Sequence, residues 1–254
     1  MLCRRHPPAR RRNEPGLFAT RAPVESRWTG RRPTPASIAD IGCGRGTTTV
    51  RLGRQYPTAT ILAVDQSPAL LAVTAGRMRD QKRAPHLVNA DFHHLPDNLR
   101  DIDLAVAAFC LYHSPHPRRA LAEIAQCLAP GGNAVITTKS ADSYHELDAL
   151  VAASKLDPDA RNRASLYQSF HSDNAQPELD AAGLVLRHRL DQHHTFLFAG
   201  LAHLADYLTT CPKYQLPAEL ANDPVALAEA LRRRLPDEPV AATSTVTYLV
   251  ATRP

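Results

Sequence analysis

The segment "IADIGCGRG", residues 38–46, places three glycines at alternate positions directly after a short apolar run. Because glycine has no Cβ, Gly42, Gly44 and Gly46 allow the backbone to adopt positive φ values and to approach a ligand closely. Their GxGxG spacing differs from the GxGxxG fingerprint of dinucleotide sites. Asp40 precedes the loop, and its negative charge suits a ligand with a cationic ammonium or sulfonium group better than a phosphate.

Short apolar runs alternate with helical patterns from residue 38 onward, which is typical of βαβ units with a parallel sheet. Residues 140–182 and 191–244 are much longer than ordinary connections, so we expect them to form helical lid insertions over a substrate. The predicted fold of residues 38–254 is α/β, a Rossmann-like doubly wound seven-stranded sheet with this lid. The strands are predicted over residues 38–41, 60–64, 86–89, 103–109, 133–138, 184–190 and 245–252.

The positive charge of the chain is concentrated at its start. Residues 1–34 contain nine arginines and two acidic residues, a net charge of +7, which leaves −2 of the total of +5 for the rest of the chain. The leader over residues 1–37 is rich in arginine and proline and has neither a helical nor a strand period, so we expect it to be poorly ordered. An organelle transit peptide and a misassigned start codon are the alternatives.

The remaining composition excludes several classes of protein. No apolar run reaches the roughly 18 residues of a membrane span, and the N-terminus lacks the apolar core of a secretory signal, so we expect a cytoplasmic protein without a membrane partner. The five cysteines are scattered and odd in number, which favours reduced thiols over disulfides. The histidine pairs at 93–94 and 193–194 lack a third ligand at a metal-binding spacing, so no metal site is predicted.

Acidic residues stand at the ends of successive predicted strands. Asp65 ends the second strand in "ILAVDQS", where a carboxylate is placed to accept both hydroxyl protons of a ribose. Asp91 follows the third strand in "VNADF" and could accept from an adenine amine while Phe92 or Leu62 covers the ring. Together with Asp40, these acids describe a nucleoside pocket that has no phosphate site.

These segments, with "DIDLAVAAFCLYHSPHPRRALAEIAQCLAPGG" and "NAVITT", resemble class I S-adenosylmethionine-dependent methyltransferases of the small-molecule type 11/12 group. The resemblance is dense over residues 38–139 and looser over the final "TSTVTYLVATRP". It implies strand order 3-2-1-4-5-7-6 with the last strand antiparallel, and S-adenosylmethionine as the cofactor. In this family the residues before the glycine loop close over the cofactor, and here Trp28 and Phe18 are the aromatic residues of the leader; another subunit or residues 191–244 could provide closure instead.

The resemblance also assigns cofactor contacts. It implies that the turn from Gly42 to Gly46 contacts the methionyl end of the cofactor, Asp65 the ribose and Asp91 the adenine. Cys43 is a common residue at its position, and we expect no reactivity from it. The full set of predicted cofactor-binding residues is Asp40, Gly42, Cys43, Gly44, Gly46, Asp65, Gln66, Ala90, Asp91, Phe92 and Phe109.

Methyl transfer from a sulfonium requires the protein to align the acceptor, exclude water and remove a proton where necessary. The fourth strand ends in "FCLYHSPHP", which puts Tyr112 and His113 beside the methyl-donor position. His113 is the candidate general base, and the alternative is a helix cap or a residue that only lines the pocket. Tyr112 could bind substrate or form an aromatic wall. Predicted substrate contacts in the insertions are Tyr144, His171 and Tyr207.

The predicted function is methyl transfer to an oxygen or nitrogen of a small molecule, in the sense of a secondary metabolite. The alternative is a protein of the same fold that binds S-adenosylmethionine without methylating. A nucleic-acid methyltransferase is disfavoured, because "FCLYHSP" lacks the NPPY-like element that holds a flipped base. A monomer or a homodimer is expected, and the substrate remains open.

Overall fold

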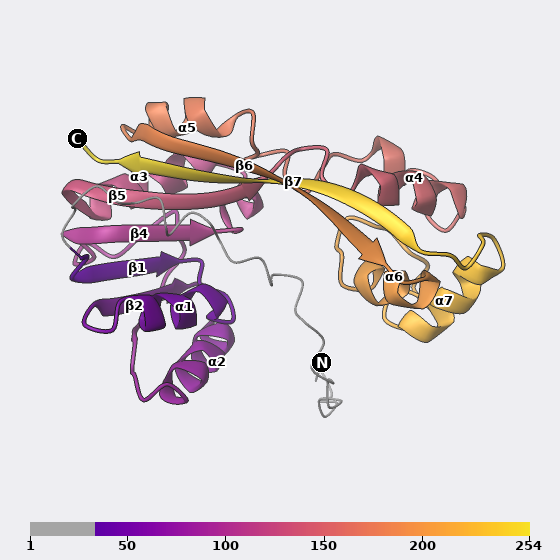
Figure 1. Cartoon of the computed structure of the whole chain (residues 1–254), viewed down its shortest axis with the longest axis horizontal. Helices are drawn as coiled ribbons and strands as arrows, with labels where there is room; N and C mark the ends of the chain where they lie inside the picture. Colours follow the sequence, from indigo (N-terminus) through magenta and orange to yellow (C-terminus); the bar gives the residue numbers. More distant parts are fainter. Residues whose placement is uncertain (1–33) are drawn as a thin grey trace. The chain divides into compact units, whose positions relative to one another are not determined.

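The strands of the computed structural model, which describes residues 34–254, form one seven-stranded sheet (Figure 1). Its order is β3-β2-β1-β4-β5-β7-β6, and β7 runs antiparallel to both β5 and β6. This confirms the predicted fold class and strand order. The predicted leader lies outside the described residues except for its last four positions. The strands are β1 (Ser37–Ile41), β2 (Thr60–Asp65), β3 (His86–Asn89), β4 (Ile102–Ala108), β5 (Leu128–Lys139), β6 (Val185–Phe198) and β7 (Val240–Thr252).

Helices follow most of the strands along the chain. Local sequence defines the start of α2, since Ser67 Oγ accepts a hydrogen bond from Leu70 N and Pro68 occupies the first turn. Within residues 34–254, every helix is too short or too polar to cross a bilayer. The helices are α1 (Thr47–Gln55), α2 (Pro68–Arg79), α3 (Pro117–Cys127), α4 (His145–Ala153), α5 (Ala175–Ala181), α6 (Leu201–Leu208) and α7 (Pro224–Arg232), with 3₁₀ turns η1 (Leu111–His113) and η2 (Ala160–Asn162).

Alternation along the strands directs side chains to the two faces of the sheet. On one face, Val64 of β2 belongs to a large core that also contains Ile124 of α3 and Leu179 of α5. On the other face, Ala63 packs with Leu71 of α2. The sheet is therefore covered by helices on both sides, as expected for a doubly wound fold.

The pairing of β6 and β7 continues well beyond the predicted strand ends. It runs without a break from His188↔Val250 to Phe198↔Val240, although the sequence predicts strands that stop at residue 190 and start at residue 245. Residues 191–198 alternate between exposed and more buried positions, which is a strand period that their histidines and glutamine hide from a search for apolar runs. Part of the predicted insertion 191–244 is therefore a β-ribbon, and its helical part is confined to residues 199–239.

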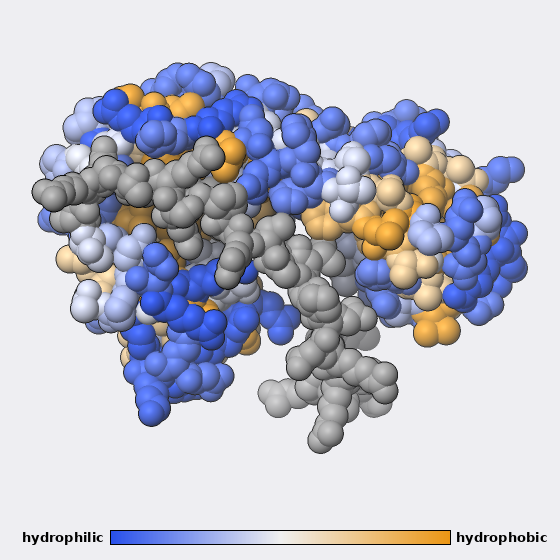
Figure 2. Space-filling view, viewed as in Figure 1, coloured by the Kyte–Doolittle hydropathy of each residue, from blue (hydrophilic) through white to orange (hydrophobic). Residues whose placement is uncertain are grey.

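The helices at the far end of this ribbon form a second core (Figure 1). Helices α4, α6 and α7 bury Leu147, Leu204 and Leu227 completely. Figure 2 shows hydrophobic surface on this helical part as well. Tyr112 packs against both this core and the core of the sheet, so the two cores meet at the end of β4.

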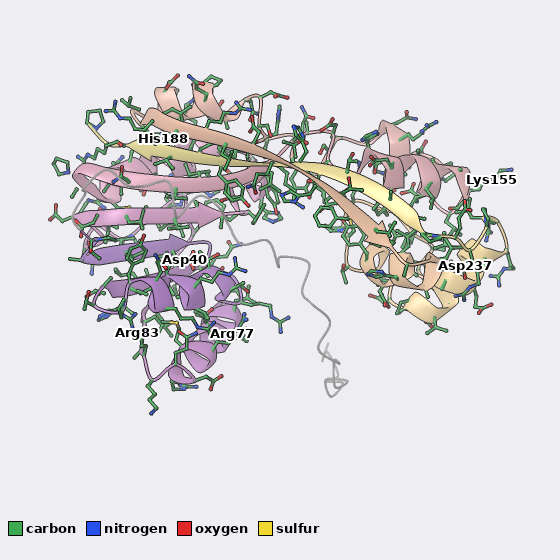
Figure 3. The ribbon with its side chains drawn as sticks, viewed as in Figure 1. Asp40, Arg77, Arg83, Lys155, His188 and Asp237 are labelled. Atoms are coloured by element: carbon green, nitrogen blue, oxygen red, sulfur yellow. The ribbon has the colours of Figure 1, made fainter. Side chains whose placement is uncertain are left out.

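One carboxyl group is buried beneath the first strand. Asp40 of β1 (Figure 3) is only 1% exposed and accepts a hydrogen bond of 2.5 Å from Thr49 Oγ1 at the start of α1. Burial raises the pKa of Asp40 from 3.8 to about 7, although the hydrogen bonds from Thr49 act in the opposite direction. The folded protein therefore takes up a proton at Asp40 more readily than the unfolded chain does.

This burial predicts how stability depends on pH. Between pH 3.8 and about 7 the folded state binds more protons at Asp40 than the unfolded state, so this residue lowers the free energy of unfolding as pH rises. We expect Asp40→Asn to raise the free energy of unfolding near neutral pH and above, by up to about 4 kcal/mol. The gain should shrink as pH falls toward about 4. Urea unfolding across this pH range checks it, and a gain that is independent of pH would contradict it.

Candidate functional site

The predicted cofactor-binding residues gather at one edge of the sheet. Strands β1 to β5 are parallel, so their carboxyl ends lie along the same edge. The glycine loop follows β1, Gln66 follows β2 and Phe109 follows β4, while the segment from Ala90 to Phe92 follows β3. The structure thus brings these residues to a common edge, although they are spread over almost seventy positions of the sequence.

The glycine loop is packed at its ends and open in its middle. Gly42, Gly44 and Gly46 all have positive φ, at 65°, 55° and 75°. A Cβ on Gly42 would lie 2.8 Å from Cys110 Cβ, and one on Gly46 would lie 2.6 Å from Thr74 Oγ1. A Cβ on Gly44 would meet no described atom within 4 Å. The loop therefore presents bare backbone to a space that a ligand can approach.

Asp65 is held directly against this loop. Its Oδ2 accepts a hydrogen bond of 2.8 Å from Gly44 N, and its Oδ1 accepts one of 2.9 Å from Ser67 N. Each carboxylate oxygen has further capacity to accept, so both can still receive hydroxyl groups of a ligand. Asn89 Nδ2 donates to the carbonyl oxygens of Asp65 and Gln66 at 3.0 Å each, which ties the end of β3 to the end of β2.

Asp40 and Cys43 are buried residues that hold the glycine loop in place. The Asp40 carboxylate faces Thr49 and is fully buried, so it acts on the loop through α1 and does not present itself at the open face. Cys43 N donates to Val64 O at 2.9 Å. Burial, helped by the charge of Asp40, raises the pKa of the Cys43 thiol to about 12. The thiol is therefore protonated at neutral pH, in keeping with the expectation that it does no chemistry.

Asp91 begins a chain of polar contacts that reaches the loop after β4. Its Oδ1 accepts from His93 N at 2.9 Å and lies 2.7 Å from His93 Nδ1, while His93 Nε2 lies 2.6 Å from Ser114 Oγ. The hydrogen bond from His93 N lowers the pKa of Asp91, which keeps this carboxylate ionised. The network links the predicted adenine acid to the loop that carries His113. The D-x-H spacing of "ADFHH" is its only sequence signal.

Phe92 provides an apolar surface beside these acids. It packs against the core of the sheet, and its ring centroid lies 4.7 Å from that of His93. Its Cδ1 atom is 3.9 Å from the position of a Cβ on Gly42. Phe109 follows β4 with φ of 56°, and its N donates to Thr137 O at 2.9 Å. Aromatic rings thus lie at both the β3 end and the β4 end of this edge.

Tyr112 and His113 lie in η1, directly after β4. The Tyr112 ring packs edge-on against Tyr167, with 4.8 Å between ring centroids, and Ser169 Oγ donates to Tyr112 O. Burial raises the pKa of the Tyr112 phenol to about 12, so it remains a neutral hydrogen-bonding group. The His113 ring packs on Tyr112 at 4.4 Å, and partial burial lowers its pKa below 6.5. His113 is therefore neutral at pH 7 and able to accept a proton.

Two of the three predicted substrate residues line a pocket in the helical part. Tyr144 and Tyr207 face each other with 5.9 Å between ring centroids, and both line a small pocket. His171 lies elsewhere, in a turn where its Nδ1 accepts from Asp173 N at 3.3 Å, so local structure accounts for it. The pocket is lined by Ser143, Tyr144, Asp148, Ser165, Leu166, Tyr167, Tyr207, Cys211, Lys213 and Tyr214.

The same pocket contains an ion pair that no sequence pattern predicts. Lys213 Nζ lies 2.5 Å from Asp148 Oδ2, and Tyr214 Oη donates to Asp148 Oδ1 at 3.0 Å. Both charged side chains are nearly buried, at 10% and 14% exposure. Lys213 and Asp148 are far apart in the sequence, so no local pattern predicts the pair. Among the residues described by the structure, histidine, cysteine and acidic side chains form no group of three or more that could hold a metal.

Comparisons with known proteins agree with this geometry. Residues 38–132 match the model of the methyltransferase domain family. Over 121 residues the chain is 30% identical to malonyl-acyl-carrier protein O-methyltransferase of Paenibacillus sp. (strain JDR-2), which covers 46% of this chain and 43% of the relative. It is 38% identical over 101 residues to trans-aconitate 2-methyltransferase of Methylobacterium nodulans, covering 39% of this chain and 36% of the relative. The chain thus spans less than half of the curated relatives it matches.

Solved structures share the fold over most of the chain. BH2331 of Bacillus halodurans C-125 superposes with a TM-score of 0.61 at 17% identity, covering 88% of this chain and 95% of that one. The cyclase SpnF gives a TM-score of 0.53 at 20% identity, covering 86% and 75%. The family match lies on the glycine loop and strands β1 to β4, and the observed strand order is the one expected of the same family. Residues 38–132 of this chain therefore match the methyltransferase domain family, and the fold is the one expected of class I S-adenosylmethionine-dependent methyltransferases.

Proposed function

We propose that this protein binds S-adenosylmethionine at the carboxyl edge of β1 to β4 and transfers its methyl group to an oxygen or nitrogen of a small molecule. The observation that carries the proposal is the bond from Gly44 N to Asp65 Oδ2, which places an acid beside a loop whose middle is open. The similarity to malonyl-acyl-carrier protein O-methyltransferase and trans-aconitate 2-methyltransferase supports an acceptor group of small size. A secondary-metabolite acceptor, a cytoplasmic location and a monomeric or homodimeric state stay predictions from the sequence.

The residues at this edge fit the cofactor in their chemistry. Asp65 and Asp91 are acceptors for hydroxyl and amine groups, Phe92 is an apolar cover, and the bare backbone at Gly44 lets a ligand come close. The acids also suit a sulfonium better than a phosphate, because charge repulsion opposes phosphate binding here. When bound, S-adenosylmethionine supplies an activated methyl group.

The chain contributes position and proton transfer. Tyr112 lies at the junction of the two cores, so it can form a wall that excludes water between the sheet edge and the helical part. His113 follows it in η1 and would take a proton from an acceptor hydroxyl or ammonium group. Tyr144 and Tyr207 would contact the acceptor in the pocket that they line.

Cofactor binding is tested by calorimetric titration with S-adenosylmethionine and with S-adenosylhomocysteine. We expect both to bind the wild type, and Asp65→Ala to weaken binding of each by about a hundredfold, because two charge-assisted hydrogen bonds are lost. Asp180→Ala is the matched control, since it removes a carboxylate on α5 and should leave binding unchanged. Absence of binding to the wild type contradicts the proposal.

A general base at His113 predicts a pH dependence. Because partial burial lowers its pKa from the ordinary histidine value, the unprotonated form prevails at neutral pH, and activity should fall only at acidic pH. His113→Gln should lower kcat by about 10²- to 10⁴-fold and remove this acidic limb. The measurement is a kcat profile against pH with an acceptor found by screening for products that gain one methyl group. An unchanged profile in the variant would show that His113 only lines the site.

A second candidate is a reaction on the same fold that binds the cofactor without methylating. The similarity to the cyclase SpnF supports this second candidate, because this chain shares the fold of that protein. Mass spectrometry of the product separates the two functions. A product that has gained one methyl group, with release of S-adenosylhomocysteine, supports methyl transfer, and an isomer of the acceptor supports the second candidate.

A further inference from the structure

Lys139, the last residue of β5, carries an almost buried ammonium group that methyl transfer leaves without a role. The residue is 9% exposed, and its Nζ donates a hydrogen bond of 2.7 Å to Tyr144 Oη. Three aromatic rings surround the ammonium, with centroids at 4.4 Å for Tyr144, 5.5 Å for Tyr167 and 5.8 Å for Phe109. Such rings attract a cation, and the surroundings therefore favour a charged lysine in part.

The charge of Lys139 is not balanced by an acid in residues 34–254. Its ammonium can donate three hydrogen bonds, and the Tyr144 hydroxyl is the one acceptor that the described residues provide. Burial accordingly lowers the pKa of Lys139 to about 8. Lys213 in the neighbouring pocket differs, because it is paired with Asp148 at 2.5 Å. A nearly buried cation without an acid is costly, so an anionic ligand would gain from binding here.

Lys139 also contacts residues from both parts of the proposed site. Phe109, one of the three rings around the ammonium, follows β4 at the edge where the cofactor is proposed to bind. The other two rings, Tyr144 and Tyr167, line the pocket of the helical part. The ammonium therefore adjoins residues of both the proposed cofactor edge and the pocket.

The choice of lysine at this position is unusual for this chain. The sequence contains four lysines and 26 arginines, so positive charge is ordinarily supplied by arginine. Two of the four lysines, Lys139 and Lys213, belong to the pocket and its aromatic wall. A compact ammonium takes less room among the three aromatic rings than a planar guanidinium group would.

We propose that Lys139 binds a carboxylate group of the acceptor molecule and thereby selects carboxylic acids as substrates. The inference rests on the proposed function for the position of the cofactor. It identifies the chemical group through which the protein holds the acceptor, and this group need not be the one that receives the methyl. The charges favour a carboxylate over a phosphate. Lys139 and Lys213 with Asp148 leave one net positive charge, which matches a carboxylate, whereas a phosphate monoester carries about −1.5 to −2 at neutral pH.

The test compares acids with uncharged amides of the same shape. Ligand-observed NMR is used to measure binding of benzoate and benzamide, and of cinnamate and cinnamamide, to protein saturated with S-adenosylhomocysteine. We expect each acid to bind about 10- to 100-fold more tightly than its amide, as expected for one charge-assisted hydrogen bond. Phenyl phosphate is the third probe, and it should bind more weakly than benzoate.

Matched variants assign the effect to one residue. Lys139→Gln should abolish the preference for acids over amides and, because it removes a nearly buried charge, should fold normally. Lys155→Gln removes a lysine from the exposed turn after α4 (Figure 3) and should keep the preference. Equal binding of acid and amide by the wild type, or a preference that survives in Lys139→Gln, would overturn the proposal, as would tighter binding of phenyl phosphate.

A measurement on the wild type alone provides a second readout. In protein labelled with ¹³C at lysine Cε, the signal of Lys139 is assigned by its absence from Lys139→Gln. Benzoate should raise the pH at which this signal titrates and leave Lys155 unchanged, and no movement of Lys139 would contradict the inference. Binding of S-adenosylhomocysteine is measured separately on the same samples. Absence of S-adenosylhomocysteine binding would overturn the proposed function. The acids and amides would then be compared in protein without S-adenosylhomocysteine, and this comparison still decides the role of Lys139.

Discussion

The hydrogen bond from Gly44 N to Asp65 Oδ2 is the contact on which the arrangement of the candidate site depends. Parallel pairing of β1 with β2 brings the two residues to the same edge of the sheet, and the bond then fixes the carboxylate against the loop. Asn89 ties the end of β3 to the same place through the carbonyl oxygens of Asp65 and Gln66. These contacts use backbone N–H and carbonyl groups of the loop and the strand ends. They therefore depend on the positive φ of Gly44 more than on how neighbouring side chains pack.

The two hydrophobic cores position different parts of the candidate site. The core of the sheet places the strand ends, and the core of α4, α6 and α7 builds a pocket rich in tyrosine. Tyr112 packs against both cores, so the 3₁₀ turn η1 connects the proposed cofactor edge with the proposed acceptor pocket. The long pairing of β6 with β7 is what carries the second group of helices, since α6 and α7 lie between these two strands in the sequence.

Two ionisable groups of opposite sign are buried without a partner of opposite charge among the described residues. Asp40 is held beneath the glycine loop with a raised pKa, and Lys139 lies among aromatic rings with a lowered pKa. In each case loss of hydration is the principal cause, and in neither case does a group of opposite charge restore the balance within residues 34–254. Perturbed groups of this kind concentrate at functional sites, where a ligand supplies the missing partner. Asp40 is screened from the open face by the loop, whereas Lys139 adjoins the pocket, and this difference is why the latter invites a ligand.

Local patterns in the sequence determine the alternation of strands and helices, the glycine loop, the acids at the strand ends and the start of α2 at Ser67, because each depends on neighbouring residues only. Strand order follows from the resemblance that these patterns carry. Only the tertiary structure decides the length of β6 and β7, because their outer halves are held by pairing with each other and not by apolar residues. It alone shows that His93 bridges Asp91 and Ser114, and that Phe109, Tyr144 and Tyr167 enclose Lys139. These contacts join segments that are far apart in the chain. They arise from loop conformation and burial, and no short stretch of sequence encodes either of these.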